Sequence, residues 1–167
     1  KSLSSEIVEK ELKQKLDNSN VQDSIVLIKP NSDFGKGIVD FKLTNHLIDN
    51  FFQSNKDQVV LMPGFIASSK DDNTTTLGRG GSDYTAAILA NGVNAELLEI
   101  WTDVSGMYTA NPRIVHQAQP IAMISYQEAM ELSHFGAKVL YPPTIQPVLE
   151  KNIPILIKNT FEPESEG

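Results

Sequence analysis

The sequence predicts an α/β protein with a mainly parallel sheet sandwiched between helices. First, short all-apolar runs alternate with longer amphipathic stretches, which is the pattern of buried parallel strands joined by helices. Second, the chain has 167 residues and is 40% hydrophobic, enough for one domain with an apolar core. Third, no internal repeat or low-complexity segment interrupts the alternation. Together these observations favour a globular domain over a repeat protein or a disordered chain.

The first half of the chain is expected to alternate helices with strands. Residues 3–16 gather their apolar side chains on one helical face, and residues 41–52 repeat that pattern. Two runs of four apolar residues, 25–28 and 59–62, have the length and composition of buried strands. The long polar connection that follows, residues 65–81, is typical of functional or disordered loops.

The second half continues the alternation with helices that carry clear start signals. Ser82 can cap the alanine-rich helix that follows it, and Ser125 and Glu128 have the spacing of a capping box. Gly136 suits the end of that second helix. The other expected elements are strands at 97–101 and 153–157 and a helix at 142–150 that opens with two prolines. We expect one partial domain over residues 1–161 and a linker or tail over 162–167.

Composition excludes several classes of function. The formal net charge is −7 and no basic patch is visible, which argues against a nucleic-acid partner. The absence of cysteine excludes disulfides, thiolate catalysis and cysteine-ligated metal, and fits a cytoplasmic protein. The three histidines are too scattered along the sequence to suggest a metal site. No apolar run approaches the roughly 20 residues of a membrane span, so no membrane partner is expected.

A glycine-rich loop precedes the alanine-rich helix. Gly78, Gly80 and Gly81 flank Arg79, and glycines let backbone N–H groups converge on an anion at a helix N-terminus. Arg79 can bind a carboxylate or phosphate through two hydrogen bonds. Asp83 can bind a substrate ammonium, or hold a lysine that in turn binds phosphate. An arginine and an aspartate together suit a zwitterion such as an amino acid. The glycine spacing matches neither a Walker motif nor a Rossmann fingerprint. The same residues would also make a flexible turn with an ordinary first-turn acid, and spacing alone does not separate these two readings.

A second polar loop, residues 102–113, follows the strand expected at 97–101. Asp103 comes just after that strand, and ligands collect at the carboxyl ends of strands in open α/β sheets. Its carboxylate can accept hydrogen bonds from ribose hydroxyls, Tyr108 offers an aromatic face and Arg113 can reach a phosphate. The loop is also rich in turn-forming residues, which makes an ordinary turn the simpler reading of this loop by itself. If both loops bind ligands, we expect them to converge on one crevice.

Several long motifs, in order, carry a family resemblance. They are PGFI (63–66), TTTLGRGGSDYTA (74–86), WTDVSGMYTANPR (101–113), SYQEAMEL (125–132), FGAKVLYP (135–142) and IPILIKNTF (153–161). With these motifs the chain resembles the aspartate kinases of the amino-acid kinase family. The resemblance implies transfer of the ATP γ-phosphoryl group to the β-carboxylate of L-aspartate, the first step toward lysine, threonine and methionine. It also implies a Mg²⁺ ion bound mostly through the ATP phosphates, and a homo-oligomeric full-length protein.

The resemblance assigns roles to residues of both loops. It implies that Arg79 clamps a carboxylate of aspartate, and that Asp83 organises catalytic lysines. Lys138 is implied to be a catalytic lysine on the phosphate or nucleotide side. The remaining aspartate contacts that it implies are Phe65, Thr76, Gly80, Gly81 and Ser82, and the implied nucleotide contacts are Thr102, Asp103, Tyr108, Arg113, Lys138 and Val139.

Departures from the family pattern matter for activity. The Lys-Phe-Gly-Gly-Thr-Ser segment that opens the family's kinase domain has no counterpart here, nor do the small regulatory domains that usually follow. We therefore interpret the chain as the ATP-binding, C-terminal portion of a kinase domain whose N-terminal part is missing, and expect it to be inactive alone. The alternatives are another family member acting on glutamate, acetylglutamate or a nucleotide, a non-catalytic ligand-binding or dimerisation module, and a dinucleotide-binding oxidoreductase domain.

Overall fold

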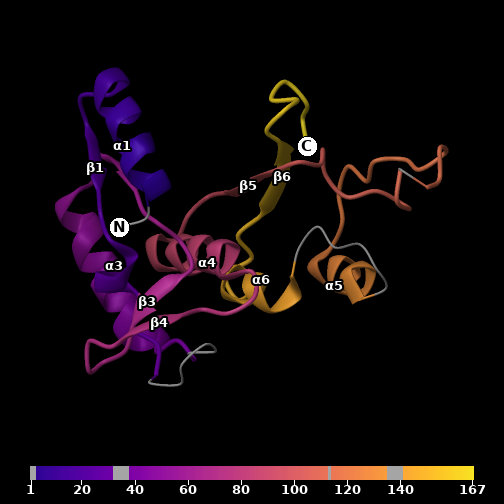
Figure 1. The fold of residues 1–167 in the computed structure, drawn as a ribbon. Helices are drawn as coiled ribbons and strands as arrows, with labels where there is room; N and C mark the ends of the chain where they lie inside the picture. Colours follow the sequence, from indigo (N-terminus) through magenta and orange to yellow (C-terminus); the bar gives the residue numbers. More distant parts are fainter. Residues whose placement is uncertain (1–2, 32–37, 113, 135–140) are drawn as a thin grey trace. The chain divides into compact units, whose positions relative to one another are not determined.

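The computed structural model describes residues 3–31, 38–112, 114–134 and 141–167 (Figure 1). The chain divides into two compact units, Lys1–Val93 and Asn94–Gly167. The first unit holds the long connection and the glycine-rich loop, and the second holds the loop that follows the strand expected at 97–101. Each unit is described separately below.

The first unit combines helices with two short strand pairs. Strands β1 and β2 pair in parallel, with Asn20 opposite Val60, whereas β3 and β4 form an antiparallel hairpin with Ala67 opposite Thr75. The elements are α1 (Leu3–Lys15), β1 (Ser19–Val21), α2 (Ser24–Leu27), α3 (Phe41–Ser54), β2 (Val59–Leu61), β3 (Ile66–Ser68), β4 (Thr74–Thr76) and α4 (Gly81–Val93).

The prediction of a buried strand at residues 25–28 was wrong, because this segment forms the short helix α2. The Asp23 carboxylate accepts a hydrogen bond from the Ile25 N–H and caps the helix. Leu27 and Ile28 are buried, while Val26 is 53% exposed, so the run has a helical pattern of burial. A four-residue apolar run cannot be assigned to strand or helix by periodicity alone.

Two other expectations in this unit need correction. The connection at 65–81 contains the β3–β4 hairpin and is therefore more ordered than a loop. Ser82 lies inside α4, which begins at Gly81, and so does not cap it. The strand expected at 59–62 is confirmed as β2, but Val59 is 48% exposed and the strand is not fully buried.

The core of the first unit lies between α3, α4 and the hairpin. Ile48 of α3 and Ile88 of α4 are fully buried, and Ala67 of β3 joins them. Gly92 lets the two helices approach closely, because a Cβ atom there would lie 2.6 Å from Ile48 Cγ2. This packing fixes α4, whose first turn carries the glycine-rich loop.

The second unit contains a parallel strand pair and two helices. β5 (Leu98–Thr102) pairs with β6 (Ile155–Asn159) from one end to the other, and Thr102 lies opposite Asn159. α5 (Tyr126–His134) begins with the predicted capping box, in which the Ser125 N–H donates to Glu128 Oε2 (2.9 Å) and the Glu128 N–H donates to Ser125 Oγ (3.2 Å). α6 (Pro142–Leu149) opens with its two prolines as expected. Gly136 lies outside the described residues.

The α/β class is confirmed, with β1–β2 and β5–β6 as parallel pairs accompanied by helices. No helix among the described residues combines the length and apolar character needed to span a bilayer.

Candidate functional site

The hairpin brings Phe65 to the start of α4. Phe65 precedes β3 and has a left-handed backbone with φ of 76°, which is rare for a residue with a bulky side chain. Its N–H donates to Thr85 Oγ1 (3.0 Å), and its carbonyl accepts from the Leu77 N–H (3.0 Å). Because Thr85 Oγ1 also donates to the Gly81 carbonyl (2.7 Å), one buried hydroxyl connects the hairpin to the first turn of α4.

Glycines make this approach possible. Gly78 and Gly80 have φ of 77° and 68°, a region that glycine adopts without steric cost. Gly81 packs directly on Phe65, since an added Cβ would lie 2.7 Å from the Phe65 ring atom Cδ2. Thr76 pairs with Ile66 at the same end of the hairpin. The structure thus brings Phe65, Thr76 and Gly81 together at the start of α4.

The polar members of this loop differ in exposure. Arg79 and Ser82 are exposed at the turn into α4, whereas Asp83 is half-buried in the first helical turn. Burial raises the pKa of the Asp83 carboxyl above 3.8. Carboxyls with raised pKa values gather at functional sites, although burial alone can also produce them. Asp83 lies in the first turn of α4, where the helix N-terminus favours an anion.

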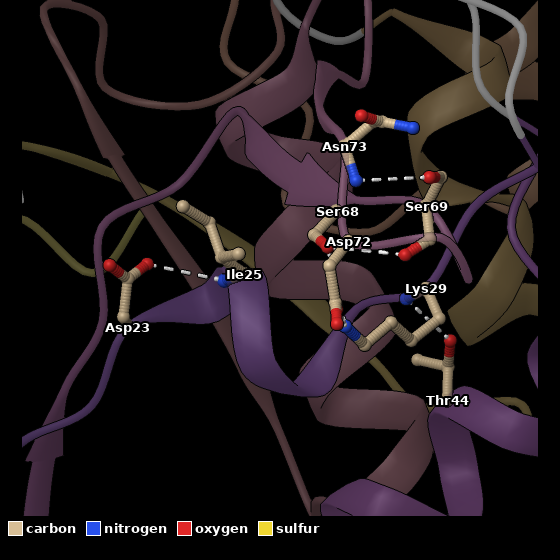
Figure 2. Close-up of polar contacts among 8 residues, drawn as sticks. All are labelled: Asp23, Ile25, Lys29, Thr44, Ser68, Ser69, Asp72 and Asn73. Carbon is tan, nitrogen blue, oxygen red and sulfur yellow. Dashed lines mark hydrogen bonds and ion pairs between the residues drawn. The ribbon is translucent and has the colours of Figure 1, made fainter.

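The opposite end of the hairpin is held by a lysine that sequence reasoning missed (Figure 2). Lys29 Nζ donates to Ser68 Oγ (3.3 Å) and pairs with Asp72 Oδ1 (3.1 Å). Its backbone N–H donates to Thr44 Oγ1 (3.1 Å), which ties this contact to α3. The Lys29 side chain is 15% exposed but that of Asp72 is 87% exposed, so the pair contributes more to the location of the hairpin than to stability.

The second loop begins where β5 ends. The Thr102 carbonyl accepts from the Thr160 N–H (2.8 Å), and Thr102 Oγ1 donates to Asp103 Oδ1 (3.3 Å). Asp103 is exposed, which leaves its carboxylate accessible to a ligand. Farther along, Tyr108 forms an antiparallel bridge with Pro120. The predicted position of Asp103 at the carboxyl end of a parallel strand is therefore correct.

This loop is held by hydrogen bonds among three side chains that the sequence did not single out. Ser105 Oγ donates to Glu162 Oε2 (2.7 Å) and accepts from Asn159 Nδ2 (2.9 Å). Asn159 lies in the IPILIKNTF motif, which carries part of the family resemblance, but the sequence interpretation gave Asn159 no role. Its position opposite Thr102 is the signal that could have identified it, because parallel strands bring their carboxyl ends together.

Three residues assigned to the nucleotide site, Arg113, Lys138 and Val139, lie outside the described residues. The two loops belong to different units, so their convergence on one crevice stays a prediction. Among the residues that the structure describes, no three His, Asp or Glu side chains are grouped to hold a metal ion.

Comparison with known proteins identifies the family. The profile of the Amino acid kinase family matches residues 1–159, nearly the whole chain. The chain belongs to the amino acid kinase family. The resemblance carried by the two loops is thereby confirmed at the level of the family.

Curated relatives that the chain matches are aspartokinases. The chain is 55% identical to a bifunctional aspartokinase/homoserine dehydrogenase of Buchnera aphidicola subsp. Acyrthosiphon pisum over 113 residues, which cover 68% of this chain and 14% of that protein. It also resembles the crystal structure of Escherichia coli aspartokinase III with lysine and aspartate, with a TM-score of 0.90 and 36% identity over 98% of this chain and 37% of that one.

A second structure of Escherichia coli aspartokinase III, in complex with aspartate and ADP, matches with a TM-score of 0.86 and 38% identity. That match covers 94% of this chain and 36% of the other. The chain thus spans well under half the length of each of these relatives.

Proposed function

We propose that the chain forms the ATP-binding portion, and part of the aspartate site, of an aspartate kinase. The full-length protein would transfer the γ-phosphoryl group of ATP to the β-carboxylate of L-aspartate. The aspartokinase relatives support this proposal, as does the solved complex of one of them with aspartate and ADP. We infer further that the full-length protein is a cytoplasmic homo-oligomer.

The observation that carries the proposal is the structure of the glycine-rich loop. Gly78 and Gly80, both at positive φ, carry Arg79 between them at the N-terminus of α4. In that position the guanidinium can take a substrate carboxylate through two parallel hydrogen bonds. Phe65 and Thr76 border the loop, and the Ser82 hydroxyl is exposed beside it. An arginine and a half-buried acid within five residues fit a substrate that carries both charges, such as an amino acid.

The second loop is proposed to bind the nucleotide. Asp103 would accept hydrogen bonds from ribose hydroxyls, with Thr102 beside it and Tyr108 contacting the base or sugar. Arg113, Lys138 and Val139 are proposed as further nucleotide contacts through the family resemblance, with Lys138 as a catalytic lysine on the phosphate or nucleotide side.

Phosphoryl transfer of this type needs no covalent enzyme intermediate. A β-carboxylate oxygen of aspartate forms a bond to the γ-phosphorus, and the bond from that phosphorus to the bridging oxygen of ADP breaks, so ADP leaves with the electron pair. The chain contributes orientation and charge stabilisation. Mg²⁺ would neutralise phosphate charge and be held mainly by the phosphates themselves.

Steady-state kinetics of the full-length protein test the proposal. Arg79→Ala should raise the aspartate KM by about 10- to 100-fold and leave the ATP KM nearly unchanged, because it removes a charge-assisted two-point contact. Arg79→Lys, the matched control, keeps the charge but not the planar fork and should lose less. Asp103→Ala should have the converse effect, raising the ATP KM. Equal effects of both alanine variants on both substrates would contradict the division of roles.

A panel of acceptors tests the substrate itself. Aspartate should support ADP release, whereas glutamate, acetylglutamate and UMP should not. Turnover with one of these in place of aspartate would reassign the protein within its family.

A further inference from the structure

Asn159 lies at the carboxyl end of β6, opposite Thr102 of β5, and is 8% exposed. A buried side-chain amide is costly unless its donor and its acceptor both find partners. Figure 1 shows β5 and β6 side by side where this pairing occurs. The amide is therefore placed beside the first residue of the proposed nucleotide loop.

Both ends of the Asn159 amide are used. Oδ1 accepts from the Phe161 N–H (3.0 Å), and Nδ2 donates to Ser105 Oγ (2.9 Å). Since a backbone N–H can only donate, the amide oxygen must face Phe161 and the NH₂ group must face Ser105. The Ser105 hydroxyl in turn donates to Glu162 Oε2 (2.7 Å). The chain of hydrogen bonds therefore has one direction, from amide to hydroxyl to carboxylate.

This chain of hydrogen bonds holds the first half of the loop. The start of the loop is held by the Thr160 N–H on the Thr102 carbonyl, and beyond Ser105 the loop is held at Met107, which is 4% exposed and accepts from the Ile121 N–H (2.8 Å). Between these anchors the backbone turns through Gly106, whose φ is 102°. Ser105 is the residue before that turn and lies two positions from Asp103.

We propose that Asn159 is a positioning residue for nucleotide binding, which acts through Ser105 to hold the Thr102–Asp103 segment in its binding geometry. This inference rests on the proposed nucleotide role of that loop. Asn159 itself need not touch ATP. Small displacements of a positioned group can cost far more in binding and rate than in stability, so the ATP KM is the sensitive measurement.

The test is steady-state kinetics of the full-length protein carrying Asn159→Asp. This substitution keeps the acceptor for the Phe161 N–H, removes the donor to Ser105, and places a second carboxylate near Glu162. The ATP KM should rise about tenfold, the loss expected for one hydrogen bond and a like-charge contact, while the aspartate KM stays within twofold. Ser105→Ala should act in the same direction, and the double variant should show less than the product of the two effects.

Two control variants separate positioning from general damage. Ser105→Thr keeps the hydroxyl and should retain the wild-type ATP KM. Lys158→Met changes the residue before Asn159 in β6. Side chains alternate between the two faces of a strand, and Lys158 Nζ lies 5.1 Å from the centroid of the Trp101 ring. It should leave both KM values unchanged.

The outcomes are distinguishable. Wild-type ATP and aspartate KM values in Asn159→Asp would overturn the inference and leave the proposed function intact. Equal increases in both KM values, matched by Lys158→Met, would also overturn it, because they indicate general destabilisation. If the wild-type protein neither binds nor hydrolyses ATP with any acceptor, the proposed function and this inference both fall.

Discussion

The glycine-rich loop and the strand-end loop are built by opposite means. The first depends on glycine residues, which have no Cβ atom. Gly81 leaves room for the Phe65 ring, and Gly78 and Gly80 adopt positive φ angles that most other residues avoid. The second depends on side chains that are present, since Ser105 and Asn159 hold it by hydrogen bonds. Added atoms should therefore damage the first loop, whereas deleted polar groups should damage the second.

The difference has a physical basis in what each loop is proposed to bind. A small substrate gripped by backbone and one arginine needs close approach of the main chain, which glycine permits. A nucleotide contacted by the exposed Asp103 needs a loop backbone with a fixed position after the end of the strand. A network of side-chain hydrogen bonds can fix that position. Unfolding of the 167-residue chain and kinetics of the full-length protein can both test this contrast.

The largest effect is expected from Gly81→Ala. The new Cβ would lie 2.7 Å from Phe65 Cδ2 and 3.3 Å from Leu77 Cβ, so overpacking should lower the free energy of unfolding by about 1–3 kcal/mol. Urea denaturation measures this loss. Gly92→Ala is the matched control: it overpacks Ile48 and should destabilise the chain, yet leave the aspartate KM of the full-length protein unchanged. An unaltered aspartate KM in Gly81→Ala would remove Gly81 from the proposed site.

Thr85→Val should have the next largest effect. The substitution conserves volume but removes the acceptor for the Phe65 N–H and the donor to the Gly81 carbonyl. Leaving buried polar groups unpaired should cost about 1–3 kcal/mol, again measured by urea denaturation.

Thr44→Val is the control for Thr85→Val, since Thr44 is equally buried and accepts from the Lys29 N–H. Both variants should lose similar stability, but only Thr85→Val should raise the aspartate KM of the full-length protein. Similar KM values in the two variants would mean that Thr85 does not shape the loop.

Ser105→Ala should cost less stability, about 0.5–1.5 kcal/mol, the usual contribution of a hydrogen bond that lies near solvent. Thermal unfolding followed by circular dichroism can detect the resulting drop in Tm. A loss as large as that of Gly81→Ala would contradict the contrast between the loops, because it would make the Ser105 network a core element.

Asp83→Asn should give the smallest effect and is expected to stabilise the chain. Burial raises the pKa of Asp83 above 3.8, so the folded state binds its proton more tightly than the unfolded state does. The stability that this proton binding contributes is fully present below pH 3.8, the ordinary pKa of the group. It is lost as the pH rises through the raised pKa of Asp83 in the folded state. The Tm of the variant should therefore exceed that of the parent at pH 7 and converge with it below about pH 4.

The effect should be modest because Asp83 is only half-buried and solvent screens its charge. A lower Tm for Asp83→Asn at pH 7 would show that the carboxylate is stabilised by a partner in the isolated chain. Its half-buried position would then have a structural explanation in place of a functional one.

The sequence predicted local features whose signals are local. The capping box at Ser125 and Glu128 is a pattern of four neighbours, and it forms as expected. The strand before Asp103 was recognised from its apolar run. The family was recognisable because both loops keep long motifs. The roles assigned to Arg79, Asp83 and the nucleotide contacts stay predictions.

Features that depend on distant partners were missed. The run at 25–28 forms helix α2, in which the local Asp23 cap is accompanied by a distant contact, because the Ser24 hydroxyl donates to the Ile66 carbonyl (2.9 Å). The β3–β4 hairpin escaped notice because its strands are three residues long and β4 consists of threonines alone. Such short strands are marginal in isolation, and this pair is held by contacts from α2 and Lys29.

The sequence by itself determined the α/β class, the family and the places where ligands are expected, since apolar periodicity, helix caps and glycine spacing act between near neighbours. Only the tertiary structure decided that Thr85 joins Phe65 to α4 and that Asn159 reaches Ser105 across 54 residues of chain. Hydrogen bonds between side chains far apart in sequence leave no periodic trace, because their partners meet only after strands and helices have packed.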